Sequence, residues 1–155
     1  MTAGHRRPQS AAMVRSTSRR ILPIATGAFV ACAIVQVFLA GLGVFDGPGA
    51  FVTHREFGTT FGWLTLIILV LALVGRSGRR IVGLAVLLLV LFTLQSVFVA
   101  LRTDLPAIAA LHPLNGFAIL GVAVVMTRMA WAARRVDVPE AVGASAAVPA
   151  GPEAA

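Results

Sequence analysis

Four apolar runs without an acidic residue decide what this chain can fold into. They cover roughly residues 21–45, 57–75, 81–101 and 106–133. Each run is close to the ~20 residues that a helix needs to cross ~30 Å of hydrocarbon at ~1.5 Å of rise per residue. A chain that is 58% apolar and only 12% charged also lacks the charge that a soluble surface requires. Nothing alternates in the ~10-residue segments of a membrane β-barrel.

The runs predict an all-α membrane protein, a four-helix transmembrane bundle of up-down-up-down topology without a soluble domain. We expect helices at about 21–45, 54–75, 81–101 and 106–133. The transmembrane domain would span residues 19–135, between a disordered basic tail at 1–18 and a disordered Ala/Pro-rich tail at 136–155. Two prolines leave the start of the last helix undecided, because it either starts at Pro106 and kinks near Pro113 or starts at Pro113 after a short interfacial segment.

All thirteen basic residues are arginine, and their distribution predicts the orientation in the membrane. Only Arg55 and Arg102 fall on one side, and the others flank the opposite ends of the apolar runs. The positive-inside rule therefore predicts a multi-pass protein of the bacterial plasma membrane with its N-terminus and C-terminus in the cytoplasm. Such a basic edge would attract the headgroups of membrane lipids. It gives no reason to expect nucleic-acid binding, because membrane topology already explains it.

Two similar motifs stand at the same ends of the second and fourth runs, each with a histidine, a glycine four residues later and a glutamine in the preceding run. Their residues are His54 and His112, Gly58 and Gly116, and Gln36 and Gln95. The glutamines lie 59 positions apart and the histidines 58. This agreement indicates an internal repeat of two duplicated hairpins.

The two histidines are candidate ligands of a haem. In an up-down-up-down bundle the second and fourth helices are diagonal and run in the same direction, so His54 and His112 would face each other near the outer leaflet. Two neutral imidazoles are suited to hold a low-spin b-type haem as axial ligands. A spacing of four places Gly58 and Gly116 beneath the rings, where they would leave a slot for the flat macrocycle.

Further residues near the expected haem have candidate roles. Arg55 and Arg102 are the cations on the histidine side of the membrane, where they could meet haem propionates. Gln36 and Gln95 are candidate hydrogen-bond partners around the cofactor. Zinc is disfavoured as the metal, because two histidines without another Cys, Asp or Glu at the same depth half-fill a tetrahedral site.

A structural interpretation of the same residues competes with this one. Histidines at a membrane interface hydrogen-bond to water and loop carbonyls, and glycines allow helices to pack closely. Glutamine amides hydrogen-bond between helices for ~0.6 to 2 kcal/mol. None of these roles requires a cofactor.

Some of these motifs also carry a resemblance to a known family. They are His54-Arg55 with Gly58, and Gln95 followed by Leu111-His112 and Gly116. In them the chain resembles one four-helix half of the haem A synthase-like membrane haem proteins, over roughly residues 20–133. That family places haem ligands at the outer ends of the second and fourth helices of each half, so the resemblance implies that His54 and His112 are an axial pair.

Two departures from that family limit what the resemblance implies. Its oxygenating half has a glutamate three residues before the first histidine, where this chain has Phe51, and many members have paired cysteines that this chain lacks. We therefore do not expect haem A synthesis by this chain alone. The run Leu-His-Pro-Leu-Asn-Gly at 111–116 is also similar to that of small four-helix bacterial membrane proteins of unknown function, which implies no activity.

The expected function is therefore electron transfer or haem handling by one b-type haem, together with other membrane subunits or an electron-transfer partner. The alternative is a cofactor-free membrane accessory or assembly subunit. A small transporter is disfavoured, because the four runs hold no acidic residue to couple protons or cations. We expect no catalytic activity from the chain alone, since it shows no recognisable nucleophile, phosphate loop or paired carboxylates.

Overall fold

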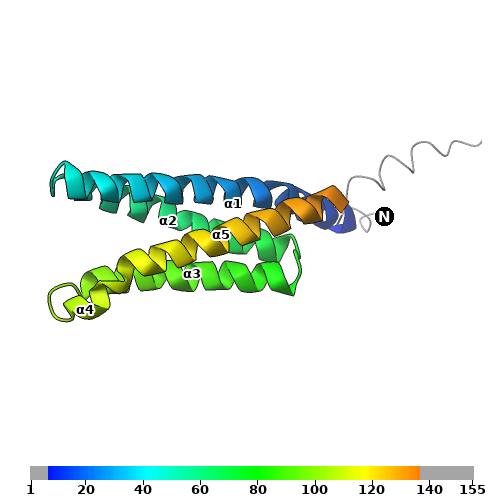
Figure 1. Cartoon of the computed structure of the whole chain (residues 1–155). Helices are drawn as coiled ribbons and strands as arrows, with labels where there is room; N and C mark the ends of the chain where they lie inside the picture. Colours follow the sequence, from blue (N-terminus) through cyan, green and yellow to red (C-terminus); the bar gives the residue numbers. More distant parts are fainter. Residues whose placement is uncertain (1–6, 137–155) are drawn as a thin grey trace, which may run out of the picture.

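Residues 7–136 are described by the computed structural model, and their regular structure is helical throughout (Figure 1). The helices are α1 (Arg7–Phe45), α2 (Ala50–Val74), α3 (Arg79–Ala100), α4 (Pro106–Ala109) and α5 (Leu111–Val136). Four spans are long and apolar enough to cross a membrane. They are most of α1, all of α2 and α3, and the span Pro106–Arg134, which comprises α4 and most of α5. The predicted all-α four-helix membrane protein is thereby confirmed.

The four long helices form a closed ring of neighbours. α1 packs against α2, α2 against α3, α3 against α5, and α5 against α1, which leaves α1 and α3, and α2 and α5, as diagonal pairs. The beginning of α1 and the end of α5 lie at the same end of the bundle (Figure 1). We call α1 and α2 the first hairpin, and α3 and α5 the second.

The two ends of the bundle differ in their charged residues. One end carries the arginines of early α1, of the turn between α2 and α3, and of late α5, and we call it the arginine end. These residues are Arg7, Arg15, Arg19, Arg20, Arg76, Arg79, Arg80, Arg128, Arg134 and Arg135. The opposite end, where α2 and α5 begin, carries His54 and His112, and we call it the histidine end.

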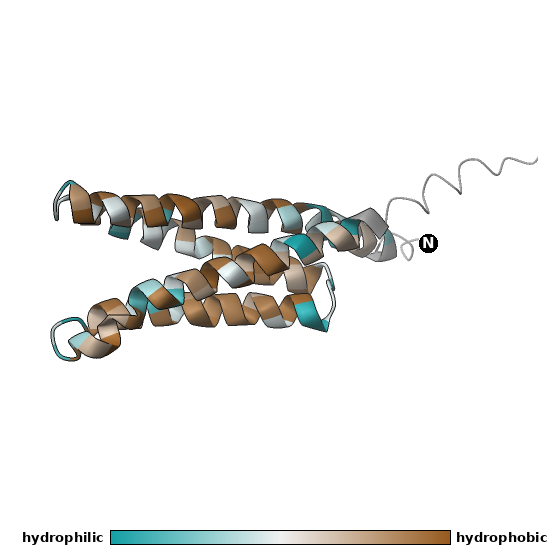
Figure 2. Ribbon diagram, viewed as in Figure 1, coloured by the Kyte–Doolittle hydropathy of each residue, from teal (hydrophilic) through white to brown (hydrophobic). Residues whose placement is uncertain are grey.

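Large apolar side chains cover the outside of the bundle (Figure 2). Phe38, Trp63 and Phe117 are each more than 60% exposed. In water such a surface would be unfavourable over its whole area, whereas in lipid it faces a solvent as apolar as itself. The distribution of side chains therefore agrees with the length of the helices in assigning the chain to a membrane.

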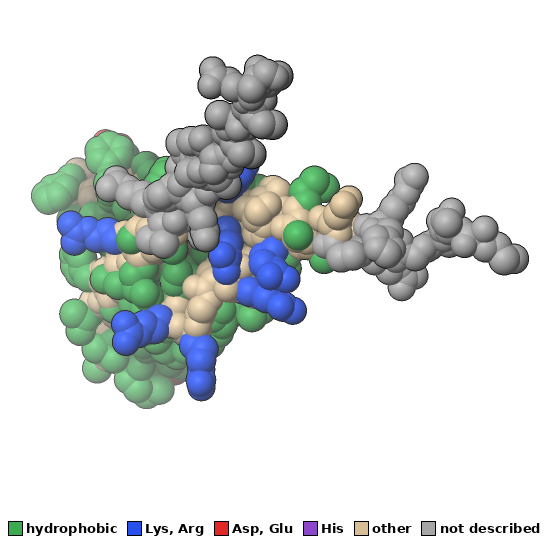
Figure 3. Space-filling view, turned by 90° about the vertical axis from the view of Figure 1, so that its right-hand side faces the viewer, with side chains coloured by type: hydrophobic (Ala, Val, Ile, Leu, Met, Phe, Trp, Pro, Cys, Tyr) green, Lys and Arg blue, Asp and Glu red, His purple; other side chains and the backbone are tan. Residues whose placement is uncertain are grey.

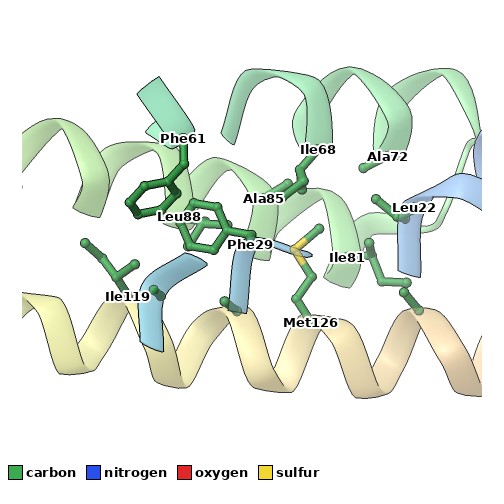
Figure 4. Packing of buried hydrophobic residues seen from close by; sticks show 13 residues of the cluster. Leu22, Phe29, Phe61, Ile68, Ala72, Ile81, Ala85, Leu88, Ile119 and Met126 are labelled. Carbon is green, nitrogen blue, oxygen red and sulfur yellow. The ribbon is translucent and has the colours of Figure 1, made fainter. Parts of the chain in front are cut away.

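The interior is aromatic at mid-height and combines alanines with Leu22 and Ile81 toward the arginine end (Figure 4). The ring centroid of Phe29 lies 5.2 Å from that of Phe61 and 6.1 Å from that of Phe92. Such edge and tilted contacts add to the packing of the large rings. Closer to the arginine end, Ala72 and Ala85 are fully buried, and small residues there let the helix backbones approach.

α1 is longer than the sequence suggests. It begins at Arg7, so the disorder predicted for residues 1–18 is wrong for residues 7–18. Its 39 residues make a helix of ~58 Å, about twice the thickness of the hydrocarbon layer. The polar segment continues the helix because Ser18 is buried and its hydroxyl donates to the Val14 carbonyl oxygen at 2.9 Å. Residues 1–6 and 137–155, which hold the rest of the two predicted tails, lie outside the described part.

The last span combines features of the two predicted alternatives: it starts at Pro106 with a short segment, and its main helix starts close to Pro113. α4 is a single turn that starts at Pro106, and α5 begins at Leu111, two residues before Pro113. Pro113 thus lies in the first turn of α5. The backbone N–H groups of a first turn have no partner within the helix, so the absence of this group in proline costs no helical hydrogen bond. His112 is part of the same first turn. α2 begins at Ala50, one turn earlier than predicted, so His54 lies within a helix as well.

Candidate functional site

A reciprocal pair of hydrogen bonds joins α1 to α2 at the histidine end. The side-chain amide of Gln36 donates to the backbone carbonyl of His54 at 2.7 Å, and Nδ1 of His54 lies 3.1 Å from the backbone carbonyl of Gln36. A carbonyl oxygen can only accept, so Nδ1 carries the hydrogen. In the neutral imidazole the lone pair then resides on Nε2.

The second hairpin repeats this arrangement between α3 and α5. The amide of Gln95 donates to the backbone carbonyl of His112 at 3.0 Å, and Nδ1 of His112 donates to the backbone carbonyl of Gln95 at 3.3 Å. Gln95 Nε2 also lies 3.5 Å from Nε2 of His112, at the limit of a weak hydrogen bond. Both glutamines that the sequence singled out therefore contact the histidine of their own hairpin.

The two imidazoles meet across the diagonal of the bundle. Their ring centroids are 6.2 Å apart and their planes are inclined by 65°. A metal–nitrogen bond of about 2.0–2.1 Å, plus about 1.1 Å from nitrogen to ring centre, places two imidazoles on opposite sides of one metal ion about 6.3 Å apart. The centroid distance between His54 and His112 is close to this value, and it is also that of an ordinary edge contact between two rings.

No third protein ligand accompanies the two rings. Within residues 7–136, no group of three or more His, Cys, Asp or Glu side chains could hold a metal ion. A bare zinc ion at this position would therefore lack half of its coordination sphere. A metal that already carries four ring nitrogens of its own, as in a porphyrin, would need only the two that this site offers.

The glycines below the histidines have a different neighbour from the one that spacing suggests. A methyl group at Gly58 would overlap the amide nitrogen of Gln36, and one at Gly116 would lie 3.4 Å from the amide nitrogen of Gln95. The space beside each glycine is therefore taken by a glutamine side chain. Gly58 allows Gln36 to reach the histidine carbonyl, Gly116 leaves Gln95 more room, and neither glycine leaves the expected slot for a macrocycle.

The two arginines of the histidine end stay at its rim. Arg55 is exposed, and the guanidinium of Arg102, also exposed, donates to the carbonyl of Val99 in its own helix at 3.2 Å. Neither forms a hydrogen bond with either imidazole in the described structure. Their position leaves both available to a group that extends out of the bundle.

Comparison with known proteins gives one match for the residues that form this site. Residues 36–102 match the model of a family of unknown function, DUF6220. The matched stretch contains Gln36, His54 and Gln95, and it ends before His112. No curated protein and no solved structure matches the chain. None of these comparisons links it to the haem A synthases, whereas they do support similarity to proteins of unknown function.

One residue of the site was missed in the sequence. Asn115 is buried, and its amide donates to the carbonyl of Leu91 at 2.9 Å and to the side-chain oxygen of Gln95. It lies three residues after His112 on the same face of α5, which was the signal that could have identified it. The equivalent position of the first hairpin is Phe57, and the side-chain oxygen of Gln36 is buried without a hydrogen-bond partner.

Aromatic side chains surround the first histidine. The ring of Phe51 contacts that of His54 edge-on at 6.2 Å between centroids, and Phe57 stacks on Phe61 at 5.4 Å one turn deeper. The imidazoles therefore lie between a polar rim and an aromatic interior. This is the boundary at which an apolar ring system with a polar edge would be accommodated.

Proposed function

We propose that this membrane protein binds one b-type haem between His54 and His112 and serves in electron transfer or haem handling. The observation that carries the proposal is the centroid distance of 6.2 Å between two imidazoles whose Nδ1 atoms both donate to backbone carbonyls. Such an outer hydrogen bond fixes the orientation of a ligating imidazole and raises its basicity. A haem held in this way would supply one-electron chemistry at its iron.

The other residues of the histidine end fit parts of this cofactor. Phe51 and Phe57 offer apolar contact for a macrocycle, and Arg55 and Arg102 offer cations for propionates at the rim. Gln36 and Gln95 would not contact the haem iron, and each would position an axial ligand by a hydrogen bond to the backbone carbonyl of that histidine. Gly58 and Gly116 contribute by admitting the glutamines.

We further propose that the two hairpins are copies of one ancestral hairpin. Buried residues recur at the offsets of the glutamines and histidines, as in Leu22 and Ile81, Phe29 and Leu88, Phe61 and Ile119, Ile68 and Met126, and Ala72 and Ala130. Each hairpin begins and ends at the arginine end, so the copies would be related by an axis along the membrane normal. An axis in that direction would relate the two imidazoles across the centre of the bundle.

A visible absorption spectrum of the detergent-purified protein tests haem binding. From haem-replete cells we expect an intense Soret band and a sharp α band after reduction. In His54→Ala and in His112→Ala the sharp α band should be lost, because one imidazole cannot hold the iron six-coordinate and low-spin, and the Soret band should shrink as weakly held haem dissociates. His5→Ala is the matched control and should keep the spectrum. Colourless wild-type protein from such cells would overturn the proposal.

A cofactor-free accessory subunit is the second candidate, and one observation favours it. The hydrogen bonds between each histidine and glutamine are complete without any ligand and tie the helices of one hairpin together. If the protein is colourless while His54→Ala lowers its unfolding temperature, the pairs serve the bundle alone.

A further inference from the structure

A cavity of about 290 Å³ opens at the arginine end, on the far side of the bundle from the histidines. Residues of α1, of the α2–α3 turn, of α3 and of α5 contribute to its lining. The polar ones are Arg19, Ser77 and Arg134, and the apolar ones include Leu22, Ile81 and Ala130. The lining thus combines positive charge with a hydroxyl and an apolar wall.

Positive charge at this end has no acidic counterpart in the part of the chain that the structure describes. Asp46, Glu56 and Asp104, the acidic residues within 7–136, all lie in segments of the histidine end. Arginine side chains gather around the arginine end when it is viewed along the bundle (Figure 3). The charged groups that the described chain places around this cavity are therefore all positive and attract an anion.

A buried hydroxyl in the cavity wall lacks a hydrogen-bond partner. The Oγ atom of Ser77 is buried, and no group of the described chain bonds to it. Buried polar atoms are ordinarily paired, and Ser77 is a lining residue of the cavity, so a ligand with an acceptor atom at this wall would supply the missing partner. α3 begins next to it after Gly78, which gives no side-chain cap, and its first backbone N–H groups add further donors.

The turn that carries Ser77 is held in place by α1. Arg19 donates from Nε to the carbonyl of Gly75 at 2.8 Å and from a terminal nitrogen to that of Arg76 at 3.2 Å. Arg134, on α5, is positioned by its own helix, with its guanidinium 5.2 Å from the ring centre of Trp131. The charged and polar groups of the cavity are therefore fixed before any ligand binds.

We propose that this cavity binds the phosphate group of an anionic membrane phospholipid. Arg134 and the Ser77 hydroxyl would donate to the phosphate oxygens, and Arg19 would add its positive charge. The apolar wall of Leu22, Ile81 and Ala130 distinguishes a lipid from free phosphate, because it offers contact to the hydrocarbon next to the headgroup. This site is independent of the histidines at the opposite end.

Binding can be measured on the full-length protein, delipidated in a neutral detergent, by native mass spectrometry and by thermal unfolding. Phosphatidylglycerol should bind with one tightly held lipid per chain and raise the unfolding temperature. Phosphatidylcholine keeps the phosphate but adds a trimethylammonium group, which Arg19 and Arg134 repel, so it should bind about tenfold more weakly. Inorganic phosphate should produce no shift at the same concentration.

Variants distinguish binding in the cavity from a general electrostatic attraction of anionic lipid to the arginine end. Arg134→Gln and Ser77→Ala should each weaken phosphatidylglycerol binding about tenfold, whereas Arg80→Gln removes the same charge outside the cavity and should change it less than about twofold. Ser77→Ala should also leave the lipid-free protein as stable as the wild type or more so, because it deletes a hydroxyl that has no partner. This second measurement shows that weaker binding does not come from misfolding.

Three results would overturn the proposal. Equal binding of the two phospholipids would remove the requirement for an anion. Equal weakening by Arg80→Gln and Arg134→Gln would assign the effect to net charge, without a specific cavity. A response to inorganic phosphate as large as that to phosphatidylglycerol would identify a site for a free anion and not for a lipid.

Discussion

At the scale of single residues, the hydrogen bonds of the histidine end depend on the close packing of a glutamine side chain against a glycine of the neighbouring helix. The amide of Gln36 reaches the His54 carbonyl only because position 58 carries no side chain. In the second hairpin the same glycine is less crowded, since a methyl group at Gly116 would lie at ordinary contact distance from Gln95. The two similar motifs therefore differ in how tightly they are packed.

This difference predicts opposite outcomes for two matched substitutions. Gly58→Ala should lower the free energy of unfolding by about 1–2 kcal/mol, because the new methyl group displaces the Gln36 amide from its hydrogen bond. Gly116→Ala should leave it unchanged or raise it slightly, because alanine favours a helix over glycine. Titration with sodium dodecyl sulfate in mixed micelles, followed by circular dichroism, measures both. Equal losses in the two variants would contradict the packing described here.

The sequence allowed part of this site to be predicted and not the rest. Equal offsets identified His54, His112, Gln36 and Gln95, because a helical bundle brings residues at matching heights together. The role of the glycines was not predictable, since spacing along one helix says nothing about which side chain of the next helix fills the space. Asn115 was missed because its partner, Gln95, lies on another helix and its burial depends on the packing of both.

At the scale of helices, the packing of the first hairpin against the second depends on a second glycine. A methyl group at Gly62 of α2 would lie 2.5 Å from Cε1 of Phe92 in α3, whereas one at Gly121 of α5 would meet nothing within 4 Å. Phe92 is itself held by Phe29 and Phe61 and cannot move without disturbing the aromatic interior. Gly62 is thus required by a close approach, and Gly121 is not.

Gly62→Ala should therefore destabilise the bundle by about 1–3 kcal/mol, the usual cost of inserting a methyl group into a filled core. Gly121→Ala is the control and should be neutral or mildly stabilising. Thermal unfolding monitored by near-ultraviolet circular dichroism is suited to this comparison, because it reports the environment of the aromatic rings. A tolerated Gly62→Ala would show that Phe92 has room to move.

Helix limits were predicted well inside the apolar runs and poorly beyond them. The hydrocarbon layer sets the length of α2 and α3, so composition alone located their ends to within a few residues. No such limit applies to α1 outside the membrane, where helix propensity and packing against the α2–α3 turn extend it to Arg7. The same applies to α4, whose single turn follows from a proline and not from hydropathy.

At the scale of the whole molecule, the arginine asymmetry predicts the orientation. The arginine end carries ten arginines of the described chain, and the histidine end carries Arg55 and Arg102. The positive-inside rule therefore predicts that the arginine end faces the cytoplasm. A reporter active only in the cytoplasm should work when fused after residue 135, and one active only outside should work when inserted at residues 46–49. The reverse pattern would contradict this orientation and would place the histidines near the cytoplasm.

The geometry of the two glutamine–histidine pairs has a consequence for the life of the protein in a cell. Each pair ties the helices of one hairpin, and the two imidazole rings meet between the hairpins. A ligand held by both rings would join the hairpins, and its binding free energy would be added to the stability of the bundle. Newly inserted copies that have not acquired it would open first at this end. Membrane proteases would then degrade these copies in preference to loaded ones, so that the amount of protein in the membrane follows the supply of its ligand.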